Sequence, residues 1–278
     1  MHALPDTTPR PAYDPIAGGY DLLTADWPYA EWLTAIEELA LEHGLAGRRV
    51  LDAACGTGKS FIPLLERGYA VTAFDASPAM AAIAAQKSGG RADVFVADMR
   101  SLRRRGDGFD LVTCLDDVLN HVIDATDVVR ALRGLERNLA PGGLLIFDVN
   151  TMAAYRDVPT VVVEDPRRVV IWQGEGAQLA RAGDTGLVRM QVLERCGRGL
   201  WRRSQTTWPH RHYPLVALER LLDAAGLRLL DVRGQLPGAR LVSPPDEDVH
   251  PKLLLVATSA RSPIPDDGRS DDELAPVI

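Results

Sequence analysis

The chain has 278 residues, of which 46% are hydrophobic and 25% are charged, and its formal net charge at pH 7 is −7. This composition is typical of a soluble globular protein, with room for one large domain plus an elaboration or for two small domains. The acidic balance argues against a nucleic-acid partner, and no apolar run is long enough to cross a bilayer. The three cysteines lack metal-site spacing and no signal peptide is visible, so we expect a reduced, cytoplasmic protein without a metal or membrane partner.

The two ends of the chain have little to bury. Residues 1–12 include three prolines, and residues 261–278 carry five acids and three more prolines. Because segments of this kind cannot offset the entropy lost on ordering, we expect two disordered tails, the second of them acidic.

Aromatic residues crowd the start of the part expected to fold. They lie close together in the sequence, as Tyr13, Tyr20, Trp27 and Tyr29. Apolar residues then recur at helical spacing over 32–40, which predicts a helix that ends at Gly44. The aromatic segment suits a lid over a bound ligand, or it simply packs the helix onto a sheet.

Residues 48–58, Arg-Arg-Val-Leu-Asp-Ala-Ala-Cys-Gly-Thr-Gly, read as a buried strand followed by a glycine turn. Gly56 and Gly58 flank this turn, as expected where a backbone approaches a ligand closely. A phosphate-binding P-loop would need glycine at Ala53, and a dinucleotide loop would need a small residue at Phe61. Both of these loops fail at one residue, whereas a tight turn without a ligand stays open.

The stretch from Asp52 to Gly58 resembles motif I of the class I S-adenosylmethionine-dependent methyltransferases, Asp-x-Ala/Gly-Cys-Gly-Thr-Gly. The resemblance implies S-adenosylmethionine as the cofactor, with its methionine end at the end of the strand. It places these residues in the cofactor site: Asp52, Ala54, Cys55, Gly56 and Gly58. Tyr20-Asp21 is similar to a Tyr-Asp pair of small-molecule methyltransferases, which implies that Tyr20 contacts the cofactor carboxylate.

Helical and strand patterns alternate after the glycine turn. We expect helices at 60–67 and 78–87, the second capped by Ser77, and strands at 69–74 and 92–97. This order predicts a parallel, doubly wound sheet.

Acidic residues follow the second and third of these strands. Asp75 stands where a carboxylate can accept both ribose hydroxyls of an adenosine cofactor, with Ala76 beside it. The resemblance implies that Asp98 accepts from the adenine amine and that the Met99 amide donates to a ring nitrogen; an exposed loop acid is the alternative for Asp98. Met80 would cover the adenine face, unless it is an ordinary core methionine.

The fourth strand is expected at 109–115 and the fifth at 144–149. No Asn/Asp-Pro-Pro-Tyr/Phe follows the fourth strand, which weighs against a nucleobase-amino methyltransferase. Asn120-His121-Val122 instead resembles the Gly/Asn-His-Leu segment of bacterial small-molecule N-methyltransferases, including those acting on nucleotide-linked amino sugars. The resemblance makes His121 the candidate catalytic base or orienting group, with a structural histidine as the alternative, and assigns Leu115 to the cofactor site.

Residues 151–213 are too long for a plain connection. Strand-like segments at 169–173, 186–196 and 200–208 predict a small antiparallel sheet, which caps the acceptor pocket in the same N-methyltransferases. The candidate acceptor-site residues are Tyr13, Trp172, Arg211 and His212. The aromatic and basic side chains of this segment could line the acceptor site, or most of them simply hold the cap together. They are Trp172, Trp201, Trp208, His210, Arg211, His212 and Tyr213.

A helix at 215–225 and strands at about 227–235 and 252–259 would complete a seven-stranded, mostly parallel, Rossmann-like α/β sheet with helices on both faces. The expected divisions are a cofactor core with an N-terminal lid at 13–150, the cap at 151–213 and the completion of the core sheet at 214–260. We expect a methyltransferase, a monomer or homodimer, that N-methylates a small-molecule substrate in bacterial secondary metabolism, such as antibiotic biosynthesis. An O- or C-methyltransferase and a non-catalytic, cofactor-binding regulator stay open as alternatives, and a nicotinamide enzyme is disfavoured.

Overall fold

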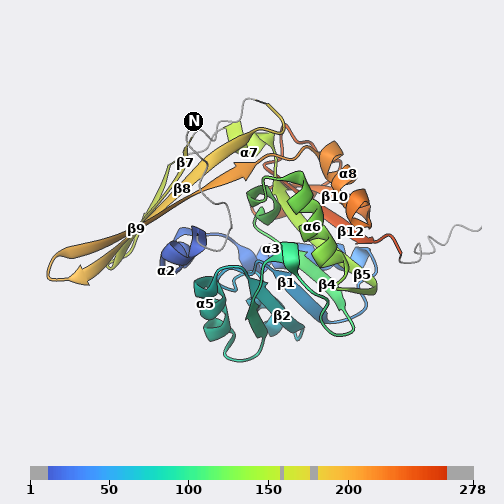
Figure 1. Ribbon diagram of the computed structural model, residues 1–278, viewed down its shortest axis with the longest axis horizontal. Helices are drawn as coiled ribbons and strands as arrows, with labels where there is room; N and C mark the ends of the chain where they lie inside the picture. Colours follow the sequence, from blue (N-terminus) through green and yellow to red (C-terminus); the bar gives the residue numbers. More distant parts are fainter. Residues whose placement is uncertain (1–11, 157–159, 176–180, 262–278) are drawn as a thin grey trace, which may run out of the picture.

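The computed structural model describes residues 12–156, 160–175 and 181–261, which form a large mixed sheet with helices on both faces and a second, antiparallel sheet beside it (Figure 1). Nearly all of both expected tails lies outside the described residues. Ala12, at the end of the first expected tail, is partly buried against the second sheet. No helix in the described ranges combines the length and the apolar character needed to cross a membrane.

The large sheet confirms the expected Rossmann-like fold. Its strand order is β11-β10-β12-β5-β4-β1-β2-β3, and β1 to β5 are parallel whereas β10, β11 and β12 are antiparallel additions. The strands are β1 (Arg49–Ala53), β2 (Ala70–Asp75), β3 (Asp93–Val96), β4 (Phe109–Cys114), β5 (Leu139–Asn150), β10 (Leu227–Leu236), β11 (Arg240–Val242) and β12 (Lys252–Ser259). The seven expected strands are joined by an eighth, β11, which was not expected because a three-residue strand forms only through its pairing with β10.

Two strand boundaries differ from the expectation. β5 begins at Leu139, because Phe109 pairs with Leu139 and a register shift follows, so the Pro-Gly-Gly segment lies within the strand. β4 ends at Cys114, one residue before the expected Leu115, and the backbone then turns sharply at the two aspartates that follow.

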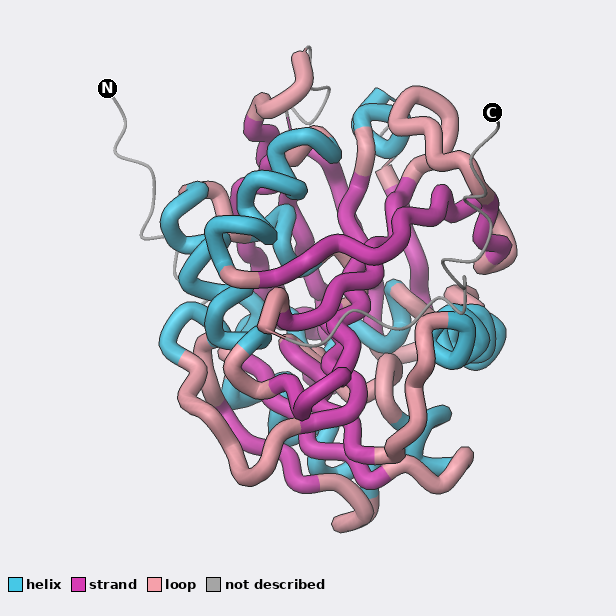
Figure 2. The backbone as a smooth tube through the Cα atoms, turned by 90° about the vertical axis from the view of Figure 1, so that its right-hand side faces the viewer, coloured by secondary structure: helices cyan, strands magenta, loops and turns pink. Residues whose placement is uncertain are grey.

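Helices cover both faces of the large sheet, as the view in Figure 2 shows. They are α3 (Tyr29–Glu42), α4 (Ile62–Glu66), α5 (Pro78–Ser88), α6 (Ala125–Glu136) and α8 (Leu215–Ala225). Neighbouring residues of β1 belong to different hydrophobic clusters, Val50 to the one beneath α3 and α4 and Leu51 to the one beneath α6 and α8. Because side chains alternate along a strand, these clusters lie on opposite faces of the sheet.

The start of α5 matches the expectation. The Ser77 hydroxyl accepts a hydrogen bond from the Met80 amide at 3.1 Å, and Pro78 occupies the first helical position. Helix α4 is shorter than expected, covering five residues of the predicted 60–67.

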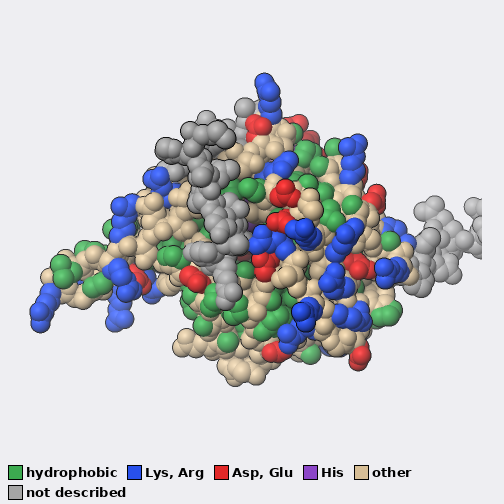
Figure 3. All heavy atoms as spheres, in the orientation of Figure 1, with side chains coloured by type: hydrophobic (Ala, Val, Ile, Leu, Met, Phe, Trp, Pro, Cys, Tyr) green, Lys and Arg blue, Asp and Glu red, His purple; other side chains and the backbone are tan. Residues whose placement is uncertain are grey.

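The second sheet contains β6 (Val161–Glu164), β7 (Arg168–Glu175), β8 (Thr185–Gly197) and β9 (Leu200–Arg211) in that order. The three expected strands are present, and β6 is an additional one. β8 and β9 form a long hairpin that projects from the body (Figure 1), and Figure 3 shows Lys or Arg side chains at its far end.

A short N-terminal segment lies against the inner face of the second sheet. It comprises the 3₁₀ helix η1 (Asp14–Ile16) and α2 (Ala17–Leu23). Ile16 packs into a cluster with Val188 and Met190, and a Cβ on Gly19 would lie 2.7 Å from the side chain of Val192. The segment therefore approaches β8 too closely for any residue larger than glycine at position 19. The remaining short helices are α7 (Met152–Arg156), η2 (Met99–Ser101) and η3 (Val118–His121).

Candidate active site

The glycine turn after β1 has a backbone that favours small residues. Ala54, Gly56 and Gly58 have φ angles of 53°, 53° and 90°, in the left-handed region. Within the described chain, nothing would lie within 4 Å of a Cβ on Gly56, whereas one on Gly58 would lie 3.1 Å from the Phe61 ring. The space above Gly56 is thus open to a ligand, and Gly58 serves close packing.

Asp52, in β1, stabilises the start of this turn through hydrogen bonds. Its carboxylate accepts hydrogen bonds from the Ser60 hydroxyl at 2.5 Å and from the Thr113 hydroxyl at 2.6 Å. Burial raises the pKa of Asp52 to about 6, against the effect of these two donors. The predicted cofactor residue Asp52 is therefore buried and links β1 to β4 and to the segment before α4. Its side chain does not line the cavity described next.

Asp75 ties the end of β2 to the glycine turn. Its Oδ2 accepts from the Gly56 amide and its Oδ1 from the Ser77 amide, each at 2.8 Å. Burial raises the pKa of Asp75, and the two amides oppose this rise by stabilising the carboxylate. Each oxygen keeps a further lone pair, so the carboxylate can still accept two hydroxyl groups.

A first cavity opens at the carboxyl ends of β1, β2 and β4, where open α/β sheets bind ligands. The structure brings all the predicted cofactor residues to its wall except Asp52 and Gly58. These lining residues are Tyr20, Ala54, Cys55, Gly56, Asp75, Ala76, Met80, Asp98, Met99 and Leu115. The cysteine in the wall, like the other two, is free, in agreement with the expected unbridged state.

Asp98 has a partner that the sequence did not indicate. Its carboxylate binds Arg100 through the guanidinium Nη2 at 2.6 Å and Nε at 3.0 Å, and Arg100 also contacts Asp127 at 3.2 Å. Burial opposes ionisation, but the hydrogen bonds from Arg100 prevail and lower the pKa of Asp98. Asp98 is therefore an ionised acceptor held in place at the cavity, not an exposed loop acid.

A second cavity of about 530 Å³ lies between the N-terminal segment, the ends of β4, β5 and β12 in the large sheet, and the second sheet. Its aromatic wall residues are Tyr13, Tyr20, Trp27, Tyr29, Tyr155, Trp172 and Trp208. Of the four predicted acceptor-site residues, Tyr13 and Trp172 therefore line it.

The prediction for Arg211 and His212 is not supported by their positions. Arg211 donates to the Ile123 carbonyl at 2.6 Å, and the buried His212 accepts from the Gly183 amide at 3.2 Å. Both residues fasten the end of β9 to neighbouring loops. His210 and Trp208 are the residues of β9 that line the cavity, and Arg211 points the other way because side chains alternate along a strand.

The two cavities share part of their walls. The residues that line both are Tyr13, Tyr20, Tyr29, Asp116 and His121. A group transferred from a ligand in the first cavity to a ligand in the second would pass between these side chains.

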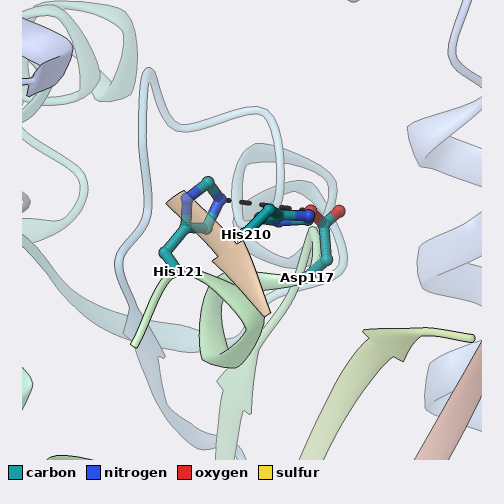
Figure 4. A group of neighbouring side chains, drawn as sticks. All are labelled: Asp117, His121 and His210. Atoms are coloured by element: carbon teal, nitrogen blue, oxygen red, sulfur yellow. Dashed lines mark ion pairs between the residues drawn. The ribbon is translucent and has the colours of Figure 1, made fainter. Parts of the chain in front are cut away.

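His121 lies at this junction in a neutral form. Its Nε2 is 3.2 Å from the Tyr13 hydroxyl and 4.0 Å from Oδ2 of Asp117, and its ring centroid is 4.6 Å from that of His210 (Figure 4). Burial, together with the nearby His210, lowers the pKa of His121 to about 3. The imidazole can accept a hydrogen bond at neutral pH, but it is a weak base.

A buried charge network continues behind His121. Asp117 lies 2.9 Å from Nε2 of His210 and 2.7 Å from Nζ of Lys252, which also binds Asp148 at 2.6 Å. Burial disfavours a charged lysine, but the three nearby aspartates raise the pKa of Lys252. Donor atoms of Asp117, His121 and His210 lie within 4.8 Å of one another, a spacing that can surround an ion, yet the Lys252 ammonium already neutralises Asp117.

His210, Lys252 and Asp117 were not selected as site residues from the sequence, although His210 was among the cap side chains considered for the acceptor site. Only the Asp116-Asp117 pair at a strand end carried a local signal, because acids at this edge of a sheet face ligands. The other two are separated from Asp117 by 93 and 135 positions.

Several proteins of similar sequence are methyltransferases. A sequence family described as "Methyltransferase domain" matches residues 50–143. YqeM of Bacillus subtilis, assigned to the methyltransferases, is 31% identical over 222 residues, which cover 78% of this chain and 87% of that protein. Rat glycine N-methyltransferase is 36% identical over 135 residues, which cover 43% of this chain and 44% of the relative.

Two solved structures are similar over most of the chain. An S-adenosylmethionine-dependent methyltransferase from Clostridium acetobutylicum has a TM-score of 0.72 at 24% identity, covering 89% of this chain and 98% of its own. The sugar N-methyltransferase KedS8 from a Streptoalloteichus species has a TM-score of 0.68 at 25% identity, covering 86% and 93%.

Proposed function

Because the chain belongs to the S-adenosylmethionine-dependent methyltransferases, we propose that it transfers the methyl group to an amine nitrogen of a small molecule. The protein is an enzyme, and its cofactor is S-adenosylmethionine. Nitrogen as the acceptor atom is supported by the similarity to the sugar N-methyltransferase KedS8 and, over part of the chain, to glycine N-methyltransferase. We further propose that the acceptor is a sugar-bearing metabolite of bacterial secondary metabolism.

The observation that carries the proposal is the shared wall of the two cavities. The first holds the turn and the acids suited to an adenosine cofactor, and the second is large, aromatic and acidic. An acceptor in the second cavity would thus lie across the shared wall from a cofactor in the first cavity. Asp116 and His121 at this junction provide polar groups for an amine.

The open space above Gly56 and the free lone pairs of Asp75 fit the cofactor. We assign the ribose hydroxyls to Asp75, the methionine end to the turn at Ala54 and Gly56, and the adenine to Asp98 and Met99. When bound, the cofactor supplies a methyl group already activated on a sulfonium.

The task left to the protein is alignment and exclusion of water. Orienting two reactants in a closed site can lower a barrier by about 7–11 kcal/mol. The tyrosines and tryptophans of the second cavity would perform this role by enclosing the acceptor. His121 would orient the amine together with Tyr13, whose hydroxyl is hydrogen-bonded to the imidazole Nε2.

The proposal is tested with deuteromethyl-labelled S-adenosylmethionine and matched acceptors, an amino sugar nucleotide and the same compound with a hydroxyl in place of the amine. Mass spectrometry of the products should show the label on nitrogen in the first compound and no label in the second. Label on oxygen or carbon would replace N-methylation by one of the alternative reactions. Tight cofactor binding without transfer to any amine, phenol or carboxylate would instead indicate a regulator.

A further inference from the structure

We propose that Asp116 binds the acceptor as an ammonium ion and takes its proton, with Tyr29 as the positioning residue. The inference rests on the N-methylation proposed above and names the acceptor as a cationic primary or secondary amine.

The first argument is the place of Asp116. It lies two residues after the end of β4 and lines both cavities, so its carboxylate lies where the donor and acceptor ligands would meet. Its φ angle is 67°, and that of the next residue, Asp117, is 51°. Two successive non-glycine residues in the left-handed region are costly, and such strain persists only where surrounding contacts hold it.

The contacts that hold this conformation leave one oxygen of Asp116 available. The Tyr29 hydroxyl donates to Oδ2 of Asp116, and the amide of Asp117 donates to Oδ2 of Asp148 at 3.0 Å. With Oδ2 engaged by Tyr29, Oδ1 of Asp116 is the oxygen that can meet the acceptor.

The second argument is the charge around the junction. The groups that face Asp116 come from several elements: Tyr13 and Tyr20 from the N-terminal segment, Tyr29 from α3, Lys59 near the glycine turn, Asp117 and His121 after β4, Asp148 from β5 and Lys252 from β12. The Lys252 ammonium contacts both Asp117 and Asp148, and the Lys59 ammonium donates a hydrogen bond to the Thr24 carbonyl. Since His121 is neutral, the described groups leave a surplus of negative charge at Asp116, which favours a cationic ligand.

The third argument is proton affinity. Burial raises the pKa of Asp116 to about 6, partly opposed by Lys252. The pKa of Asp117 is lowered well below its usual range by Lys252 and the two histidines, against the effect of burial, and that of His121 falls to about 3. Asp116 is thus ionised at pH 7.5 and binds a proton more readily than its two polar neighbours.

The reaction balances with this assignment. The proton moves from the ammonium to Oδ1 of Asp116, which frees the nitrogen lone pair. That pair forms the N–C bond as the C–S bond breaks, and the electrons of the broken bond stay on sulfur. The proton on Asp116 passes to water when the methylated amine leaves.

The test is a binding measurement on protein saturated with S-adenosylhomocysteine. Cyclohexylamine, a cation at pH 7.5, and cyclohexanol, of similar shape but neutral, are titrated by calorimetry or ligand-observed NMR. We expect the wild-type protein to prefer the amine, and Asp116→Asn to lose about 10- to 100-fold of amine affinity with no change for the alcohol. Asparagine has the same size and tolerates the left-handed conformation.

A matched control removes the same charge elsewhere. Asp107→Asn changes an exposed acid in the loop before β4, and we expect the amine preference to stay at the wild-type value. A second variant, Tyr29→Phe, removes the donor to Asp116. Because that hydrogen bond stabilises the carboxylate, the acid limb of the pH dependence of amine binding should move to higher pH in Tyr29→Phe.

Two results would overturn the inference. One is an Asp116→Asn protein that keeps the amine-over-alcohol preference. The other is a loss of S-adenosylhomocysteine affinity with unchanged amine affinity, which would assign Asp116 to the amino group of the cofactor. Because binding is measured without turnover, a failure of methyl transfer to nitrogen would contradict the proposed function separately.

Discussion

Three aspartates at the carboxyl ends of β1, β2 and β4 differ in what their carboxylates contact. Asp52 is closed in by two hydroxyl donors, Asp75 accepts two backbone amides beside the first cavity, and Asp116 accepts one phenol between the two cavities. The same side chain can therefore stabilise a turn, as in Asp52, or take the roles that we propose for Asp75 and Asp116, according to the donors and the space around it.

Removing the Asp75 carboxylate should weaken cofactor binding. Charge-assisted hydrogen bonds contribute about 1.5–3 kcal/mol, so Asp75→Ala should reduce S-adenosylhomocysteine affinity by about 10- to 100-fold in calorimetry. The Asp107→Asn variant provides the control. Normal affinity in a folded Asp75→Ala protein would remove the ribose assignment, and circular dichroism checks the fold, since two amides lose their acceptor.

Removing the His121 imidazole should affect turnover and leave cofactor affinity intact. If this side chain orients the amine, His121→Ala should lower kcat by about 10- to 100-fold. The pKa of His121 is about 3, so its titration cannot produce a change in activity between pH 5 and 8. The variant should therefore keep the acid limb of the wild-type kcat/KM profile, and loss of that limb would make His121 the base.

At the scale of elements, helix α6 holds the loop that carries Asp98 and Met99, the residues that we propose contact the adenine. Gly134 of α6 faces the backbone carbonyl of Met99, and a Cβ at position 134 would overlap that oxygen. This close contact holds η2 in place and so fixes the position of Met99 in the wall of the first cavity.

Two glycine substitutions test this contact. Gly134→Ala should lower the free energy of unfolding by about 1–3 kcal/mol and also weaken cofactor binding, because the overlap displaces η2. Gly18→Ala, in the exposed part of α2, meets only Glu194 at 3.5 Å and should be neutral or stabilising by up to about 1 kcal/mol. Urea unfolding measures both, and equal stabilities of the two variants would refute the role of this contact.

Element order could be predicted from the sequence, whereas element contacts could not. The Ser77 cap, the glycine turn and the parallel strands rest on signals within about ten residues of one another, and each occurs as expected. The cap strands were also found, but which side chains of β9 face the cavity depends on pairing with β8 and on where the strand ends. This is why Arg211 and His212 were predicted in place of His210.

For the whole molecule, the site forms where three parts meet. The N-terminal segment packs on the second sheet through Ile16, and it also lines both cavities at the carboxyl ends of the parallel strands. Ligands in the two cavities would therefore, between them, contact all three parts. Ligand binding should therefore stabilise the complete fold and not one region alone.

Thermal unfolding with cofactor measures this coupling. At a concentration 100 times its Kd, S-adenosylhomocysteine should stabilise the fold by about 2.7 kcal/mol and raise the Tm by about 5–10 °C. NADH serves as the matched nucleotide control and should leave the Tm unchanged. A shift with NADH alone would revive a nicotinamide enzyme.

The amino-acid sequence by itself determined the succession of strands and helices up to β5, the glycine turn, the acid after β2 and the methyltransferase family, because each depends on residues that are neighbours in the chain. Only the tertiary structure decided which side chains line the second cavity. Lys252 and His210 reach Asp117, next to Asp116, through strand pairing between distant segments, and the protonation of these groups depends on burial and on the distances between charges. Burial and the distances between these charges are defined only in the folded structure.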